Sequence, residues 1–338
     1  MINNIAILFC IKKAKIPKLL WVIFLNIRLG YVAMSMNLEN CSPSKTATVS
    51  VLDKLDNNKS KLNRLKHIAR ENIKNTLRIL KYNKAKGIFV YRMSSKIFPL
   101  ATYPGIEYTN YIDELRPELM ELGEFIKTND MRVSSHPDHF VLLNSISKKV
   151  YEDSVKDLKY HLGMFEAMGL DRNYKFVLHV GGMYKNKQDS ILRFYEGFNN
   201  LEDILKERII LENDDKSYNA IDVLEICNKL KIPMVLDVHH HECNKSDIEM
   251  KDLLNQAFDT WKSQDLVPKI HYSSPKDEKS FRSHADYIQT ENFYNFLTIA
   301  KEVNRDFDVM LEAKQKDNAL LELRKNLSKS IDNFINIS

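Results

Sequence analysis

The stretch PMVLDVHHH, residues 233–241, joins a short apolar run to an acid and three consecutive histidines. The apolar part follows a proline and is typical of a strand that is buried on both faces, as in parallel sheets. Three adjacent histidines directly after a buried strand are costly unless they have a role, so they indicate a metal site. This stretch therefore predicts an α/β fold with its chemistry at the end of a strand.

Seven further runs of the same kind are spread along the 338 residues. They are short and rich in Val, Ile, Leu, Phe and Tyr, as buried strands should be. The eight predicted strands are Ile27–Ala33, Ile88–Ser94, Arg132–His136, Lys175–Val180, Ile209–Asn213, Pro233–Val238, Lys269–Ser273 and Asp308–Ala313.

Helical patterns lie between these runs. Residues 113–127 place leucines and an isoleucine three and four positions apart, which gives one apolar face. Residues 151–168 show the same spacing, residues 188–207 are a third candidate helix, and residues 42–61 resemble a long loop. Eight alternating units predict a single-domain (β/α)8 TIM-type barrel, with a doubly wound open sheet as the alternative.

The N-terminal residues 1–26 have a different pattern of charged and apolar residues from the rest of the chain. Lysines precede a short apolar run, which resembles a leader, but the run is too short to span a bilayer. We expect residues 1–26 to be a leader or appended segment and residues 27–338 to form the barrel domain.

The net charge of +5 permits a polyanionic partner without requiring one.

Eight of the ten histidines lie at predicted strand ends or in the loops that follow them. Glu212, Asp237 and Glu312 also lie at or near strand ends. In a barrel these ends converge on one face, so distant residues would line one pocket. Imidazole with carboxylate suits Mn²⁺, Zn²⁺ or Fe²⁺, and several ions together suit phosphodiester cleavage. The residues alone leave two multi-metal classes open, a phosphodiesterase and a sugar isomerase.

The motifs resemble those of the UV damage endonuclease family over about residues 27–325. The resemblance rests on the motifs Ile27-Arg28-Leu29-Gly30-Tyr31, His136-Pro137, Leu178-His179-Val180-Gly181-Gly182, Leu211–Asp215, Asp237–His241, Pro268–His271, Arg282–Asp286 and Glu312-Ala313-Lys314. It implies a TIM barrel related to apurinic endonucleases. It also implies a DNA repair enzyme that nicks double-stranded DNA 5′ to cyclobutane dimers and (6-4) photoproducts, which starts excision repair.

Carried over by position, the resemblance implies a metal centre of two or three divalent ions, with Mn²⁺ expected first and Zn²⁺ as an alternative. Glu212, Lys269, His240 and Glu312 would be catalytic, and Lys269 matches a lysine that can be carbamylated. The implied ligands are His136, His179, Glu212, Asp237, His240, His271, His284 and Glu312.

Two positions depart from the family pattern. Tyr103 stands where relatives carry a ligand histidine, so we expect it to be a phenolate ligand of a weakly held ion. His139 replaces a glutamine that is thought to enter the duplex together with the next aromatic, here Phe140. We expect His139 and Phe140 to form the wedge and Tyr31 to stack on the extruded lesion.

Basic loop residues are expected to hold DNA phosphates, and Lys185, Lys276 and Arg282 are the candidates. We further expect a monomer in the cytoplasm, associated with the nucleoid, and no membrane contact. An abasic-site endonuclease or a sugar isomerase remains the alternative function. A damage sensor that has lost a metal is a third reading, suggested by Tyr103.

Overall fold

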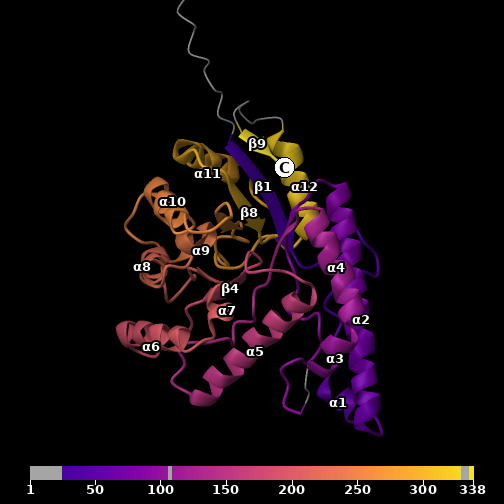
Figure 1. The fold of residues 1–338 in the computed structure, drawn as a ribbon. Coiled ribbons are helices and arrows are strands. Elements are labelled where there is room, and N and C mark those ends of the chain that lie inside the picture. The colour runs from indigo at the N-terminus through magenta and orange to yellow at the C-terminus, as the bar shows by residue number, and fades with distance from the viewer. Residues whose placement is uncertain (1–24, 106–108, 329–334) are drawn as a thin grey trace, which may run out of the picture.

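The computed structural model describes residues 25–105, 109–328 and 335–338. Eight parallel strands stand side by side in the order β3-β2-β1-β8-β7-β6-β5-β4, and helices surround them (Figure 1). The strands are β1 (Leu25–Val32), β2 (Val90–Arg92), β3 (Arg132–Ser134), β4 (Phe176–His179), β5 (Ile209–Glu212), β6 (Met234–Asp237), β7 (Lys269–Tyr272) and β8 (Phe307–Leu311).

The two ends of this row of strands meet, which makes the sheet a barrel. Ser135, directly after β3, forms a parallel bridge with Phe176 on β4. The amide of Ser135 donates to the carbonyl of Lys175 at 3.0 Å, and the amide of Val177 donates to the carbonyl of Ser135 at 2.9 Å. The predicted TIM-type barrel and its eight strands are confirmed. The open doubly wound sheet is excluded because such a sheet has two free edges.

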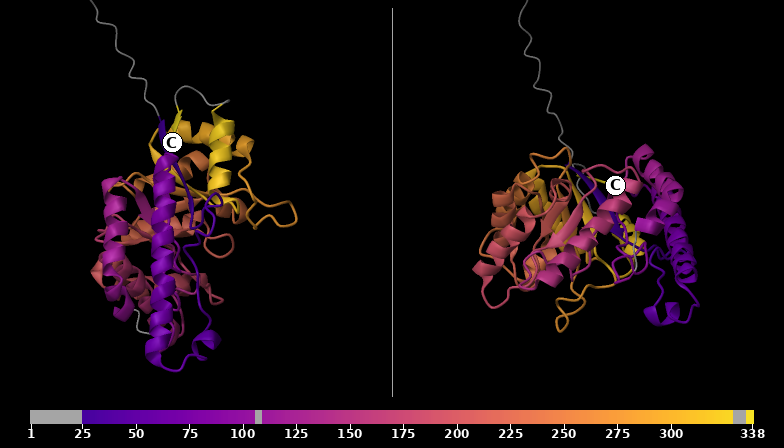
Figure 2. Two further views of the ribbon diagram at one scale, coloured as in Figure 1. Left: turned by 90° about the vertical axis from the view of Figure 1, so that its right-hand side faces the viewer. Right: turned by 60° about the horizontal axis from the view of Figure 1, so that its bottom comes forward.

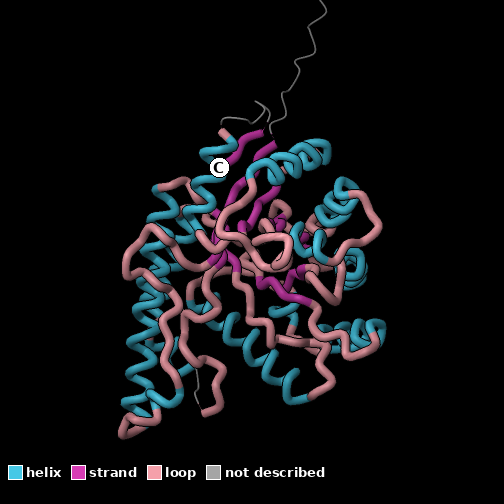
Figure 3. Tube along the Cα trace, turned by 180° about the vertical axis from the view of Figure 1, so that it is seen from behind, coloured by secondary structure: helices cyan, strands magenta, loops and turns pink. Residues whose placement is uncertain are grey.

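The helices form the outer layer, seen from behind in Figure 3 and from two further sides in Figure 2. They are α1 (Val49–Leu52), α2 (Asn58–Ala85), α3 (Thr109–Glu114), α4 (Arg116–Thr128), α5 (Lys148–Ala167), α6 (Lys187–Asn199), α7 (Asp203–Lys206), α8 (Ala220–Leu230), α9 (Val238–Cys243), α10 (Met250–Asp259), α11 (Thr290–Val303) and α12 (Lys316–Leu327).

Two sequence predictions need correction at this level, and one strand was not predicted. The helix predicted over residues 188–207 is two helices, because α6 ends at Asn199 and α7 begins at Asp203. The loop predicted over residues 42–61 contains α1 and the start of α2. A ninth strand, β9 (Ile335–Ile337), pairs in parallel with β1. Three residues are too few for a periodic pattern, which is why β9 was not predicted.

The long helix α2 was also not predicted, because asparagines interrupt its core-facing stripe. Asn72, Asn75 and Asn83 are buried on that helix. The amide of Asn72 donates to the carbonyls of Lys45 at 2.8 Å and Ile97 at 3.0 Å, which ties α2 to the loops after β1 and β2. Buried asparagines with such partners satisfy hydrogen bonds, yet they lower the apolar periodicity of the helix.

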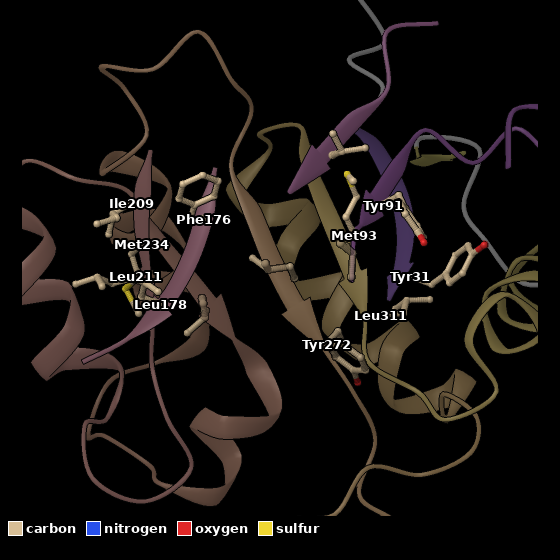
Figure 4. Packing of buried hydrophobic residues seen from close by; sticks show 14 of the residues in the cluster. Tyr31, Tyr91, Met93, Phe176, Leu178, Ile209, Leu211, Met234, Tyr272 and Leu311 are labelled. Atoms are coloured by element: carbon tan, nitrogen blue, oxygen red, sulfur yellow. The ribbon is translucent and has the colours of Figure 1, made fainter. Parts of the chain in front are cut away.

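Successive side chains along each strand point to opposite faces, so they pack in two separate regions: one between the strands and the helices, and one inside the barrel. Figure 4 shows Phe176 and Leu178 on β4 near Leu211 on β5 and Met234 on β6. These side chains belong to the large cluster packed against the helices. The intervening residue Val177 belongs instead to a small cluster inside the barrel with Ile210, Val235 and Trp261. Because side chains alternate along a strand, His179 shares the inner face with Val177.

The N-terminal end of the barrel is closed by buried charges. Asp308 on β8 accepts from Arg28 on β1 at 2.7 Å and from Arg132 on β3 at 2.6 Å. The Arg132 guanidinium also lies 5.1 Å from the centre of the Trp261 ring. Removing Asp308 would leave buried cations without a partner, which costs about 3–5 kcal/mol. The charges of Arg28, Arg132 and Asp308 are therefore structural.

One glycine fixes the spacing of the first two strands. A Cβ atom at Gly30 on β1 would lie 2.4 Å from the carbonyl oxygen of Val90 on β2, so no larger residue fits there.

Among the residues described, no helix has the length and apolar character needed to cross a membrane. The predicted leader, residues 1–26, lies outside the described residues except for Leu25 and Asn26, which already belong to β1.

Candidate metal centre and active site

Glu212, the last residue of β5, lies at the centre of a histidine cluster and is only 1% exposed. Its Oε2 lies 3.2 Å from Nε2 of His136 and 3.9 Å from Nε2 of His179. Its Oε1 lies 3.1 Å from Nδ1 of His271 and 3.4 Å from Nδ1 of His240. Residues from loops and strands far apart in the sequence therefore converge on one carboxylate, as predicted for the C-terminal ends of barrel strands.

A second carboxylate, Glu312, follows β8 and shares one of these histidines. Its Oε1 lies 3.2 Å from Nδ1 of His271, and its Oε2 lies 3.8 Å from Nδ1 of His284. The guanidinium of Arg92, the last residue of β2, donates to the same Oε1. Sequence reasoning missed Arg92. The available signal was its position at the end of a predicted strand, level with the histidines.

Asp237, which ends β6, organises the three consecutive histidines. Its Oδ1 accepts from the backbone N–H of His240 at 2.7 Å and so caps the short helix α9. Helical geometry turns successive side chains by about 100°, so the three rings separate. His240 faces Glu212, whereas the ring of His239 lies 5.6 Å from that of Phe281 and His241 is buried elsewhere. Only one histidine of the three joins the cluster.

The donor atoms form two groups that could hold a metal ion and that share Glu212. One is His136, His179 and Glu212, and the other is Glu212, Asp237, His271 and Glu312. Within the described residues, three buried atoms of the cluster make no hydrogen bond: Nδ1 of His179, Oδ2 of Asp237 and Nε2 of His271. Buried polar atoms are normally paired, so these free donors fit an ion. Imidazole and carboxylate ligands suit Mn²⁺, Zn²⁺ and Fe²⁺.

Burial and neighbouring charges in the cluster shift the pKa values of adjacent groups in opposite directions. Burial would raise the pKa of Glu212, but His271 and His179 outweigh it and hold that pKa well below its usual range. Burial raises the pKa of Asp237 to about 7. Burial alone would lower the pKa of His240, but Asp237 and Glu212 raise it to about 11. Strong mutual perturbation of this kind is typical of functional sites.

Lys269 lies on β7 two residues before His271, so both share the inner face of the barrel. It is buried, and its Nζ donates to Oγ of Ser134 at 3.0 Å. Burial, together with Arg132 and Arg92, lowers the pKa of Lys269 well below its usual value. The buried amine of Lys269 therefore gives up its proton more readily than an ordinary lysine does.

Tyr103 is not brought into the cluster. Its side chain is 42% exposed and lines a separate cavity of about 670 Å³ together with Phe98, Phe140 and Tyr160. His136 and His179 line a different pocket with Arg92. The expectation that Tyr103 replaces a ligand histidine is therefore not supported by its position.

Tyr31 is likewise placed away from the expected role. It is fully buried on β1, and its hydroxyl donates to Oδ1 of Asn83 on α2 at 2.7 Å. Its ring packs edge-on against Tyr91 at 5.5 Å, and Figure 4 shows both in the core. This corrects the sequence prediction. Because Tyr31 points outward to the helix layer, we assign it to the core and not to lesion stacking.

The residues predicted to contact DNA lie on loops that follow the C-terminal ends of the strands. His139 and Phe140 are exposed on the loop after β3, with their ring centres 6.2 Å apart. Lys185 is exposed after β4, and Lys276 and Arg282 are exposed after β7, where Nε of Arg282 lies 3.5 Å from Asp215. Further apolar side chains that sequence reasoning missed are also exposed on these C-terminal loops: Met34, Met183 and Phe281.

The fold and the cluster define the class of protein: a TIM barrel with a histidine–carboxylate centre at the C-terminal ends of its strands. A family model described as UV-endonuclease UvdE matches residues 27–338. The chain is 42% identical over 301 residues to the UV DNA damage endonuclease of Bacillus thuringiensis subsp. konkukian, covering 89% of this chain and 94% of that one. The chain belongs to the UvdE family, and its function at family level is that of a UV damage endonuclease in DNA repair.

Solved structures agree with this assignment. The crystal structure of SacUVDE superposes with a TM-score of 0.81 at 32% identity, over 90% of this chain and 98% of that one. The 3-keto-D-glucoside 4-epimerase of E. coli superposes with a TM-score of 0.54 at 12% identity, over 90% and 98% of the chains. The second likeness concerns the fold alone, and it shows that the barrel is shared with sugar enzymes.

Proposed function

We propose that this endonuclease nicks double-stranded DNA on the 5′ side of ultraviolet photoproducts, both cyclobutane dimers and (6-4) products, by metal-dependent hydrolysis. The observation that carries the proposal is the convergence of four histidines on Glu212 within 3.9 Å. A buried carboxylate surrounded by imidazoles at the open end of a barrel suits a metal site that a substrate can reach.

The eight residues implied by the family motifs would hold the metal, and Glu212 belongs to both groups of possible ligands. The free donor atoms of Asp237 and His271 support this assignment. Divalent ions bound there, Mn²⁺ first and Zn²⁺ as the alternative, would generate hydroxide and neutralise the attacked phosphate. Because Tyr103 lies outside the cluster, we propose two ions and leave Tyr103 out of the ligand set.

The protein's own residues would position the reacting phosphate. Arg92 holds Glu312 in place by its contact with Oε1. The amine of Lys269 would donate to a phosphate oxygen or, in its uncharged form, react with carbon dioxide to give a carbamate and a proton. Lys185, Lys276 and Arg282 would bind flanking phosphates, so we expect affinity for DNA to fall as salt rises.

Lesion selection would depend on deformability. A photoproduct weakens stacking and pairing, so extruding its bases costs less than extruding intact ones. Phe140 is 47% exposed beside His139, and an apolar side chain in this position suits insertion between base steps. The wedge would therefore discriminate damaged from intact DNA without reading sequence.

The alternatives predict different products. A sugar isomerase with this fold would not need an exposed wedge and a basic rim, so Phe140 and Lys276 favour the nuclease. An abasic-site endonuclease would cut at abasic sites and spare dimers. Monomeric state and a cytoplasmic, nucleoid-associated location stay predictions, which light scattering and fluorescence imaging would test.

The decisive experiment is a nicking assay on a duplex with one defined thymine dimer, with and without added Mn²⁺, beside undamaged and abasic duplexes. Glu212→Gln keeps the size of the side chain and removes the negative charge that the two groups of possible metal ligands share. We expect it to lose at least about a thousandfold in rate, as expected for a group that acts on the transition state through a metal. Glu225→Gln on the exposed face of α8 is the matched control.

A cut only 5′ to the dimer that disappears on chelation would agree with the proposal. Cutting at the abasic site alone would move the chain to the apurinic class. Retained lesion binding without any cut would mean a damage sensor, and unchanged nicking by Glu212→Gln would refute the metal centre.

A further inference from the structure

The opposite end of the barrel contains a second polar cavity, of about 500 Å³, which the proposed DNA reaction does not use. Four consecutive loops line it, each leading into a strand from β4 to β7. Lys175 directly precedes β4, and Lys231 lies shortly before β6. The metal-type residues His179 and Asp237 stand at the other ends of these same strands. DNA bound at the cluster therefore cannot contact this cavity.

The cavity is strongly cationic. Glu207 and Asp265 are the only acids among its lining residues in the described chain, against five cations. Glu207 is engaged by Arg172 at 3.8 Å, and Lys206 is engaged by Asp203 at 3.1 Å. The remaining cations in the lining make no ion pair within the described chain: Lys175, Lys229 and Lys231.

Lys175 is the buried member of this group, with 4% of its surface exposed. Its Nζ donates to the carbonyl of Glu207 at 2.7 Å and to Oε1 of Gln264 at 2.6 Å. Both acceptors are neutral, so the ammonium forms no ion pair within the described chain, and the Glu207 carboxylate acts on it only at longer range. Burial and the nearby Arg172 and Arg208 lower its pKa to about 8. A buried cation among other cations is costly unless an anion compensates it.

Two exposed lysines, Lys229 and Lys231, also line the cavity. Nζ of Lys229 lies 4.0 Å from the centre of the Tyr195 ring, a cation–π contact. Lys231 caps α8 in the left-handed region, with a φ of 57°, where glycine or asparagine is the usual residue. A lysine kept in that conformation brings a third charge to the same cavity.

We propose that this cavity, at the N-terminal ends of β4 to β7, binds a small phosphate-bearing molecule. Several cations from separate loops around one polar space suit a multiply charged, compact anion, and lysine ammonium groups are common phosphate ligands. The volume falls within the range of small-molecule sites. Amide side chains in the lining, Asn173, Asn199 and Gln264, supply further hydrogen bonds. The inference is independent of the proposed DNA chemistry.

The test is a calorimetric titration of the full chain with inorganic phosphate. The double variant Lys229→Gln/Lys231→Gly removes two exposed cations, and glycine suits the left-handed position, so the fold should be retained. We expect phosphate to bind the wild type saturably and the double variant at least about tenfold more weakly. The double variant Lys54→Gln/Lys59→Gln, which removes two exposed lysines outside the cavity, is the charge-matched control and should bind like the wild type.

Glu212→Gln tests whether phosphate binds at the histidine cluster instead. We expect this variant to bind phosphate as the wild type does. Absence of saturable binding by the wild type, equal affinity in the double variant, or loss of binding in Glu212→Gln alone would each overturn the proposal.

Discussion

The guanidinium of Arg92 on β2 donates to Oε1 of Glu312, which follows β8, across the strand β1 that separates them. This contact leaves Oε2 of Glu312 facing His284. Burial would raise the pKa of Glu312, but Arg92 and His271 lower it to about 2. Arg92 therefore keeps this carboxylate ionised and oriented, which is what a metal ligand needs.

Replacing Arg92 should therefore weaken the metal centre without abolishing the fold. We expect Arg92→Gln to lower kcat about 10- to 100-fold and to reduce bound metal, as loss of a residue that orients a ligand usually does. Arg92→Lys should recover part of both, because it keeps the charge but not the fork geometry. Nicking rates and elemental analysis measure the two effects. Arg70→Gln, which breaks the surface pair with Glu118, is the control.

Phe140→Ala should separate lesion recognition from catalysis. The side chain is 47% exposed, so we expect a change in unfolding free energy within about 0.5 kcal/mol. Binding to a dimer-containing duplex should weaken by about tenfold, since an intercalating side chain contributes on the order of 1–3 kcal/mol. Binding to undamaged DNA should hardly change. Fluorescence anisotropy on both duplexes measures this difference.

Ile146→Ala is the matched control for Phe140, because Ile146 is 70% exposed on the same connection between β3 and α5. Equal loss of affinity in both variants, or loss on damaged and undamaged DNA alike, would contradict the wedge.

Tyr31→Phe should affect stability and leave lesion recognition intact. The substitution removes the hydroxyl that donates to Oδ1 of Asn83, whose Nδ2 already lacks a partner. We expect a loss of about 1–3 kcal/mol in the free energy of unfolding, the cost of leaving a buried acceptor unpaired. Urea denaturation measures that loss. Unchanged stability combined with poorer discrimination of damaged DNA would restore the stacking role that the sequence predicted.

The lowered pKa of Lys175 predicts that the free energy of unfolding increases as the pH rises into the alkaline range. Its folded pKa of about 8 lies below the usual 10.5 of lysine, so the unfolded chain binds the extra proton between these values. The cost of burying the charge is fully present below about pH 8 and disappears as pH rises to about 10.5. We expect wild-type stability relative to Lys175→Met to increase over that window in phosphate-free buffer. A difference that is constant with pH would contradict this assignment.

The residues alone were enough to predict the barrel and most of its centre. Apolar runs that end in Glu212, Asp237 or a histidine carry the strand pattern and the chemistry in the same few positions. The C-terminal ends of parallel strands in a barrel share one face, so the convergence on Glu212 follows from connectivity. All eight histidines and carboxylates implied by the family motifs lie in or beside the cluster.

Tertiary structure decided what depends on which way a side chain faces and on what packs against it. Alternation on β1 puts Arg28 and Tyr31 on opposite faces, but only closure of the barrel determined that Tyr31 meets α2 and that Arg28 meets Asp308. Arg92, Lys175 and the helix α2 were not predicted, because their contacts are with distant segments. The side-chain amides of Asn72 and Asn75 on α2 donate to carbonyls 24 or more residues away, and Arg92 and Lys175 contact residues that come close only after the barrel closes. Local sequence carries periodicity, whereas contacts between distant segments are set by packing and burial.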